Sequence, residues 1–272
     1  MRELPILFST DMVLANLANL KNQTRRVNGL AEYNIYPNQY RIIQRDVQSG
    51  FQSFKKRTTM GHVDFKTYWD DVKCPYGKPG DILYVRENWR PRDCEFKPPM
   101  LNVEYQADNY SLNFHPGLEL VEKIEYSMIA ECQKKGLNIE GYGRFVYKNF
   151  PISWRPSIHL PKELSRIWLQ IGEIRVERLN DITEDDAIDE GIGRIFMPDE
   201  PIFYQHYGAG NIDGTTDPIE SYQSLWNSIN GSNSWDANPW VWVVKYKILS
   251  TTGRDKIPKD ILLQLDGKEA VL

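Results

Sequence analysis

The chain has 272 residues, of which 41% are hydrophobic and 26% are charged, and its formal net charge is −4. This composition is typical of a globular protein, and it excludes both a disordered chain and a strongly basic protein that binds polyanions in general. The 8 Trp, 15 Tyr and 10 Phe favour a β-rich fold or a binding groove lined by aromatic rings.

Cysteine usage and hydropathy predict the cellular setting. Cys74, Cys94 and Cys132 are odd in number and have no CxxC spacing, which argues against a disulfide framework and a zinc site, so we expect no metal or cofactor. We find no signal-peptide pattern and no apolar stretch of the ~20 residues that span a bilayer. The sequence therefore predicts a cytoplasmic protein with no membrane partner, and it leaves the oligomeric state open.

The first elements in the chain are a strand at residues 4–8 and an amphipathic helix. Thr10 or Asp11 can cap this helix, and its apolar stripe predicts that it ends near Lys21. A second strand is expected over residues 24–27.

A polar corner follows this helix. Lys21, Thr24, Arg25 and Arg26 are four hydrogen-bonding residues, three of them cationic, and such a group suits an anionic or carbonyl-bearing ligand. The alternative is that these basic residues only complement the dipole at the C-terminus of the helix.

Residues 28–78 contain scattered aromatic residues without a clean period, so we expect a loop-rich insertion. A Pro-Gly-Asp turn then leads into an alternating strand that ends at Arg86, Glu87 and, shortly after, Trp89. Glu87 shares a face with apolar residues, and an unpaired buried charge costs several kcal/mol, so this carboxylate either pairs with a cation or takes part in chemistry. Arg25 or Arg26 is the expected partner in the purely structural interpretation.

The middle of the chain has two predicted strands, at residues 102–107 and 143–147, separated by a polar segment that the pattern does not place. Ser157 then lies in a turn that can present Trp154, Arg155 and His159 together, although a single His is more often structural. Residues 165–179 predict one long strand or a strand pair, with a bulge at Gly172.

The next helix has clear end signals. Thr183 is its expected N-cap, and Gly191 follows its last turn. Glu190 lies at the C-terminal end, where an anion is unfavourable unless a cation meets it, and Lys21 or an Arg is the expected cation. After a loop at residues 193–216, Asp217 begins a helix that ends near Gly231, residues 239–249 form the clearest strand, and residues 251–272 predict a mobile tail or a weak helix.

Several stretches resemble the ASCH family of the PUA-like superfamily, and most of all the ASCH-type proteins of phages and prophages. They are, in chain order, PILFST, LKNQTRRV, YGKPGDILYVRENW, SWRPSIHLPKELSRIWLQI, ITEDDAIDEGI, SLWNSING and ANPWVWVVKYKI. The resemblance implies an α+β fold, a mostly antiparallel PUA-like β-barrel with flanking helices. It implies one domain over residues 1–250 with loop-rich insertions at about 28–78, 92–150 and 193–216, followed by a tail at 251–272.

The resemblance also implies a ligand, which is RNA, DNA, or a nucleoside or nucleotide. Small bacterial members that the chain resembles hydrolyse N4-acetylcytidine, and their Lys, Thr and Glu match Lys21, Thr24 and Glu190 as candidate catalytic residues. A Thr hydroxyl needs a base such as a desolvated Lys, and a carboxylic acid can protonate the leaving amine. The candidate substrate-binding residues are Arg25, Arg26, Arg86, Glu87, Trp89, Trp154, Arg155 and His159. The alternatives are a non-catalytic RNA- or DNA-binding module and a nuclease.

Overall fold

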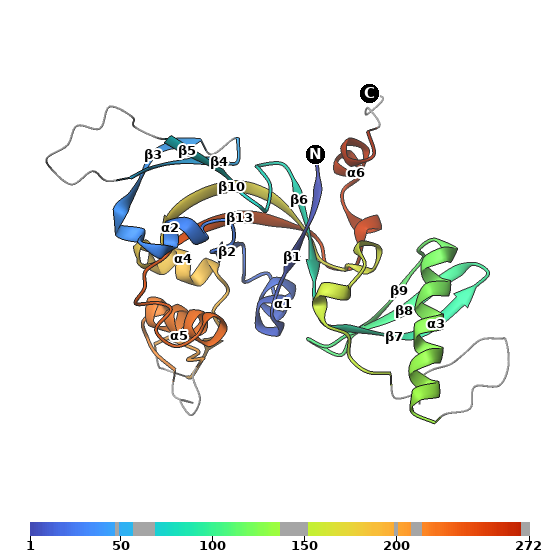
Figure 1. The fold of residues 1–272 in the computed structure, drawn as a ribbon. Coiled ribbons are helices and arrows are strands. Elements are labelled where there is room, and N and C mark those ends of the chain that lie inside the picture. The colour runs from blue at the N-terminus through green and yellow to red at the C-terminus, as the bar shows by residue number, and fades with distance from the viewer. Residues whose placement is uncertain (47–48, 57–68, 137–151, 199–200, 208–213, 268–272) are drawn as a thin grey trace, which may run out of the picture. The chain divides into compact units, whose positions relative to one another are not determined.

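The computed structural model describes residues 1–46, 49–56, 69–136, 152–198, 201–207 and 214–267 (Figure 1). It is an α+β structure, and the strand pairs for which the register is given are antiparallel. The prediction of an α+β fold with mostly antiparallel strands is therefore confirmed. The strand orders are β1-β6-β10-β13-β2, β3-β4-β5, β7-β8-β9 and β11-β12. None of these orders returns to its first strand, so the described strands do not show a closed barrel.

The strands are β1 (Glu3–Leu7), β2 (Gln23–Arg26), β3 (Tyr40–Asp46), β4 (Phe51–Lys56), β5 (Trp69–Lys73), β6 (Ile82–Arg86), β7 (Trp89–Phe96), β8 (Pro99–Tyr105), β9 (Ser111–Phe114), β10 (Trp168–Arg178), β11 (Arg194–Ile195), β12 (Phe203–Tyr204) and β13 (Trp240–Ser250). The α-helices are α1 (Thr10–Leu17), α2 (Ala31–Ile35), α3 (Leu118–Lys134), α4 (Glu184–Asp189), α5 (Pro218–Asn230) and α6 (Lys259–Leu265). Short 3-10 helices are η1 (Pro37–Gln39), η3 (Ser157–His159), η4 (Lys162–Leu164), η5 (Leu179–Asp181) and η6 (Arg254–Lys256).

The chain divides into two compact units, each built from separate ranges. Unit 1 comprises Met1–Leu4, Ala15–Ile82 and Gln170–Ile248, and unit 2 comprises Pro5–Leu14, Leu83–Leu169 and Leu249–Leu272.

 

Each unit has its own hydrophobic core. The single domain that we expect over residues 1–250 stays a prediction.

In unit 1, strand β2 pairs with the middle of β13, so that Arg25 lies opposite Val243 and Thr24 opposite Val244. Helix α4 packs against α5 beside these strands. The buried residues of this core come from η5, α4, β12, α5, β13 and the segments next to them. They include Leu179, Ala187, Tyr222, Leu225, Trp226, Val241 and Val243. The helix that follows β10 is thereby fixed next to the polar residues of β2.

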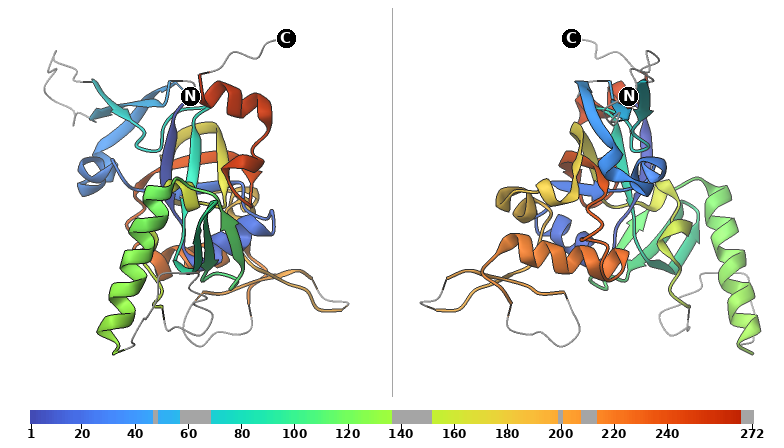
Figure 2. Two further views of the ribbon diagram at one scale, coloured as in Figure 1. Left: turned by 90° about the vertical axis from the view of Figure 1, so that its right-hand side faces the viewer. Right: turned by 60° about the vertical axis from the view of Figure 1, so that its left-hand side comes forward.

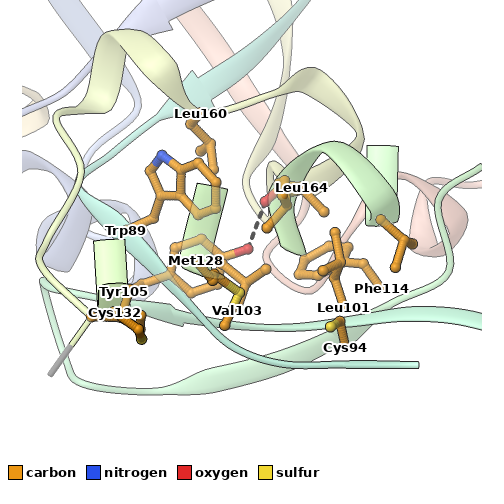
Figure 3. Packing of buried hydrophobic residues seen from close by; sticks show 13 residues of the cluster. Trp89, Cys94, Leu101, Val103, Tyr105, Phe114, Met128, Cys132, Leu160 and Leu164 are labelled. Atoms are coloured by element: carbon orange, nitrogen blue, oxygen red, sulfur yellow. Dashed lines mark hydrogen bonds between the residues drawn. The ribbon is translucent and has the colours of Figure 1, made fainter. Parts of the chain in front are cut away.

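In unit 2, helix α3 packs on the β7-β8-β9 sheet, and Figure 2 shows this helix alongside the strands. The core between them is drawn in Figure 3, where the Tyr105 hydroxyl donates a hydrogen bond of 2.6 Å to the carbonyl oxygen of Leu164. Trp89 and Leu101 are among the buried members of this core. This hydrogen bond satisfies a phenol that would otherwise be buried without a partner.

The predicted helix ends of unit 1 are confirmed. The Thr183 hydroxyl accepts a hydrogen bond from the backbone N–H of Asp186, and Gly191 follows α4 with a φ of +80°. The Asp217 carboxylate accepts from the N–H groups of Ile219 and Glu220 at the start of α5. Both caps depend on residues close in sequence, and such local signals are those that a pattern predicts best.

Other elements differ from the expectation. Helix α1 ends at Leu17, so Lys21 lies beyond its last turn. Residues 28–78, expected to be loop-rich, contain α2 and the strands β3, β4 and β5. Their aromatic residues pair between elements, as in the stacked rings of Tyr33 and Phe54 with centroids 4.2 Å apart, and this explains why they show no period along the chain.

The polar segment between the two strands expected in the middle of the chain contains helix α3. Its buried residues are Val121, Ile124, Met128 and Cys132, and this spacing is the helical stripe that the sequence analysis overlooked. The tail contains α6, with Ile261 buried, so the weak helix is the correct alternative there. The strand expected at residues 143–147 lies outside the described residues.

Candidate functional site

The centre of the candidate site in unit 1 is a buried ion pair between Lys21 and Glu190. The Lys21 ammonium group lies 2.8 Å from Glu190 Oε2 and donates a second hydrogen bond of 2.7 Å to the Glu190 carbonyl oxygen. Both residues are only 1% exposed. The cation expected at the end of α4 is therefore Lys21, and the alternative in which Lys21 only complements the dipole of α1 does not apply.

Arg25 extends this ion pair into a network. Its guanidinium group donates to Glu190 Oε1 at 3.1 Å, to Glu177 Oε1 at 2.6 Å and to Asp186 Oδ2 at 2.9 Å. Arg175 donates to two of these three carboxylates, Glu177 and Asp186, at 2.8 Å each. Three carboxylates therefore surround Arg25 and bind its Nη1 and Nη2 atoms, while its Nε has no hydrogen-bond partner among the described residues.

Burial and neighbouring charges set the protonation of this network. Burial lowers the pKa of Lys21, Glu190 opposes this effect, and the positive charges of Arg26 and Arg25 add to it. Burial alone would also lower the pKa of Arg25, but Glu190 and the other negative neighbours outweigh it, so this pKa is raised. Between the two buried cations Lys21 and Arg25, only Lys21 therefore has a lowered pKa.

The backbone at the end of α4 makes a close approach to the corner before β2. A Cβ atom built on Gly191 would lie 2.7 Å from Lys21 Cβ and 2.8 Å from Ala15 Cβ. No side chain larger than that of glycine fits there without a shift. The Asn22 backbone N–H also donates to the Asp189 carbonyl oxygen at 3.0 Å, so the corner and the helix end are held together through their main chains.

Thr24 lies within β2 and is fully buried. Its hydroxyl has no hydrogen-bond partner among the residues that the structure describes. Side chains alternate along a strand, and Arg25 and Gln23 both reach toward Asp186 of α4, so Thr24 lies on the opposite face of β2. The structure thus brings Lys21 and Glu190 into contact, and it does not bring the Thr24 hydroxyl into hydrogen-bond contact with either.

Glu87, in unit 2, has a different partner from the one expected. It pairs with Arg166, whose Nε and Nη2 atoms donate to the two carboxylate oxygens at 2.8 Å each, and neither Arg25 nor Arg26 is its partner. Arg166 also donates to both oxygens of Asp108 and lies over the Tyr105 ring, 4.3 Å from its centroid. The expectation failed because Arg166 lies 79 residues from Glu87 and no local pattern connects them.

Three other candidate residues of unit 2, Trp89, Trp154 and Arg155, take part in cation–π pairs. Arg155 lies 5.0 Å from the centroid of Trp89, and Arg90 lies 4.2 Å from that of Trp154. Trp89 is 1% exposed, so its ring is part of the core and does not offer a free stacking face.

Two further candidates of unit 2 lie near η3. The Arg86 guanidinium donates to the Ile158 carbonyl oxygen at 3.3 Å, and His159 is an exposed residue at the end of η3.

Five charged residues of these two networks were not singled out from the sequence, namely Arg175, Glu177, Asp186, Arg166 and Asp108. A signal for the first two was present, because Arg175 and Glu177 alternate with the buried Ile174 and Val176 along β10 and so share its polar face. No comparable pattern marked Arg166.

The described residues contain no group of three or more His, Cys, Asp or Glu that could hold a metal ion. Within the same part of the chain, no helix is long and apolar enough to cross a membrane. Comparisons with family models, with curated proteins and with solved structures found no match to this chain.

Proposed function

We propose that this chain is an ASCH-type protein that binds a nucleoside or nucleic acid, and that Lys21, Thr24 and Glu190 hydrolyse the amide of an N-acylated nucleoside. The observation that carries the proposal is the buried contact between the Lys21 amine and the Glu190 carboxylate, with the Thr24 hydroxyl three residues from Lys21. A lysine of lowered pKa is the kind of base that a threonine nucleophile needs.

The same proposal assigns the five-stranded sheet to a PUA-like barrel. The support is that each of the five strands of this sheet lies wholly or partly in a stretch that resembles the family, while β3, β4, β5, β8, β9, β11 and β12 lie outside those stretches. Such a division is expected when a shared framework carries insertions specific to one protein. The closure of the barrel belongs to the proposal.

The proposed reaction proceeds in two steps. The Thr24 oxygen attacks the acyl carbon while its proton passes to the neutral amine of Lys21, and the carbon–nitrogen bond breaks as protonated Glu190 gives its proton to the leaving nitrogen. The resulting ammonium and carboxylate are the ion pair that the structure contains. Water then hydrolyses the acyl ester on Thr24, which releases the carboxylic acid and restores the hydroxyl. A proton passes from the Lys21 ammonium to the Glu190 carboxylate through their hydrogen bond, and both groups regain their starting forms.

The second candidate function is binding without turnover, and two observations favour it. Lys21, Thr24 and Glu190 are at most 1% exposed, so a substrate reaches them only after side chains have moved. Thr24 also lies on the face of β2 opposite to Arg25, which is bound to Glu190. Hydrolysis therefore requires that Lys21 exchange Glu190 for the Thr24 hydroxyl when the ligand binds.

The Thr24→Val variant distinguishes the two functions. It removes the hydroxyl but keeps the shape of the side chain, and because this hydroxyl has no partner among the described residues, we expect unchanged or slightly higher stability. Release of cytidine from N4-acetylcytidine should fall at least a hundredfold in this variant, as for loss of a covalent nucleophile. Thr252→Val, the same change at an exposed residue, should leave the rate unchanged.

The outcomes separate clearly. Turnover by the parent protein that is lost in Thr24→Val, with an unchanged melting temperature, supports the hydrolase. Binding of the acylated nucleoside without turnover by the parent protein supports the binding module. Equal turnover by the parent protein and Thr24→Val refutes the role of Thr24.

A further inference from the structure

A hollow of about 300 Å³ opens within unit 2, where the end of β1 and the start of α1 meet the residues that follow β6 and β8. Its size is at the lower end for pockets that hold small molecules. Neither Lys21 nor Thr24 nor Glu190 lines it, so it is separate from the amide-hydrolysing site proposed above.

Glu87 supplies the buried polar group of this hollow. It is 2% exposed and yet lines the hollow. Arg166 occupies one acceptor position on each carboxylate oxygen, whereas a carboxylate has about four such positions. No other donor bonds to Glu87 within the described part of the chain, so acceptor positions remain for a ligand.

The charges around Glu87 also call for a donor. Glu87 and Asp108 share the single guanidinium group of Arg166, so the three side chains carry one excess negative charge. Glu87 and Arg166 are buried, whereas Asp108 is exposed to solvent. Burial raises the pKa of Glu87, Arg166 opposes this, and the charge of Asp108 adds to it. A ligand that brings N–H groups to Glu87 stabilises this charge.

The other lining residues select the kind of donor. Phe8, Val13 and Ala107 give apolar walls, against which a strongly hydrated ammonium ion would lose its water. The Ser157 hydroxyl can donate or accept, and its backbone N–H donates to Asn88 Oδ1 at 2.9 Å, which fixes the amide of Asn88 beside it. Ser9 and Thr10 also line the hollow, so four apolar and five polar residues surround it. Such a mixture suits a planar heterocycle, which has apolar faces and an edge with hydrogen-bonding groups.

We propose that this hollow binds a nucleobase with an exocyclic amino group, whose amino N–H donates to the Glu87 carboxylate. Carboxylates of Asp and Glu accept hydrogen bonds from such amino groups in nucleic-acid recognition. A base with a carbonyl oxygen in place of the amino group places an acceptor against an acceptor, and binding sites reject such a mismatch strongly.

Isothermal titration of the full chain with matched nucleosides tests this proposal. Cytidine and adenosine carry the amino group, while uridine and inosine carry an oxygen in its place. We expect at least one of the amino nucleosides to bind at least tenfold more tightly than its oxo counterpart. Glu87→Gln should reduce this affinity at least tenfold.

A second variant keeps the test valid if Glu87→Gln does not fold. Ala107→Leu adds bulk inside the hollow and leaves the Glu87–Arg166 pair in place, so it should abolish binding. Ser111→Leu, at an exposed position of β9, is its control and should bind like the parent protein. The proposal is overturned if the parent protein binds neither amino nucleoside, if the oxo counterparts bind equally well, if Ala107→Leu binds like the parent protein, or if guanidinium chloride displaces the nucleoside at equal concentration.

Discussion

Gly191 tests the packing of the Lys21–Glu190 corner without removing a charge. A Cβ atom at this position would lie 2.7 Å from Lys21 Cβ and 2.8 Å from Ala15 Cβ, and the backbone has a φ of +80°. Gly191→Ala therefore adds two costs, the strain of a side chain in the left-handed region, about 1–2 kcal/mol, and overpacking, about 1–3 kcal/mol. We expect the free energy of unfolding to fall by about 2–5 kcal/mol.

Gly80 is the matched control for this substitution. It also lies in unit 1, its φ is +88°, and no described atom lies within 4 Å of a Cβ built on it. Gly80→Ala should therefore cost only the backbone strain of about 1–2 kcal/mol. Urea denaturation followed by circular dichroism measures both variants, with the dependence on urea concentration checked for constancy. If Gly191→Ala costs no more than Gly80→Ala, the close approach between the end of α4 and Lys21 is refuted.

Three further substitutions test the charged networks. Arg166→Leu leaves Glu87 buried without its partner and should lower the free energy of unfolding by about 3–5 kcal/mol, and an unchanged melting temperature would contradict this. Lys21→Met should cost less, about 1–3 kcal/mol in urea denaturation, because Glu190 keeps its hydrogen bond from Arg25, and a cost above that of Arg166→Leu would count against this reasoning. Burial alone would raise the pKa of Asp186, but the charges of Arg25 and Arg175 outweigh burial, so the pKa is lowered from 3.8. The ionised Asp186 therefore stabilises the fold above pH 3.8, and this stabilisation is lost as the pH falls through the lower pKa of the folded state. The stability of Asp186→Asn should accordingly fall less steeply than that of the parent protein between about pH 5 and about pH 2, and parallel curves would refute the assignment.

The sequence analysis predicted those features that depend on neighbouring residues or on a simple electrostatic rule. The caps at Thr183 and Asp217 are confirmed. They could be predicted because a capping side chain bonds to backbone groups only two or three residues away. The pairing of Glu190 with Lys21 was also predicted, although 169 residues separate them, since an anion at the end of a helix needs a cation.

The features that the sequence analysis did not predict depend on tertiary packing. The predicted partner of Glu87 was wrong because the burial of a carboxylate indicates that a cation is needed but does not indicate which cation. The carboxylates around Arg25 were not predicted either. Glu177 of β10 and Asp186 of α4 are far from Arg25 in sequence, and only the folding of unit 1 brings them to it. The complete burial of Thr24 likewise depends on the pairing of β2 with β13.

The most direct test of the proposed hydrolysis is the mass of the intact protein during turnover of N4-acetylcytidine. The account predicts that an acidic quench traps one acetyl group per chain, that peptide mapping places this group on Thr24, and that Thr24→Val shows none. Turnover without an acetylated chain, or with the acetyl group on another residue, would contradict it.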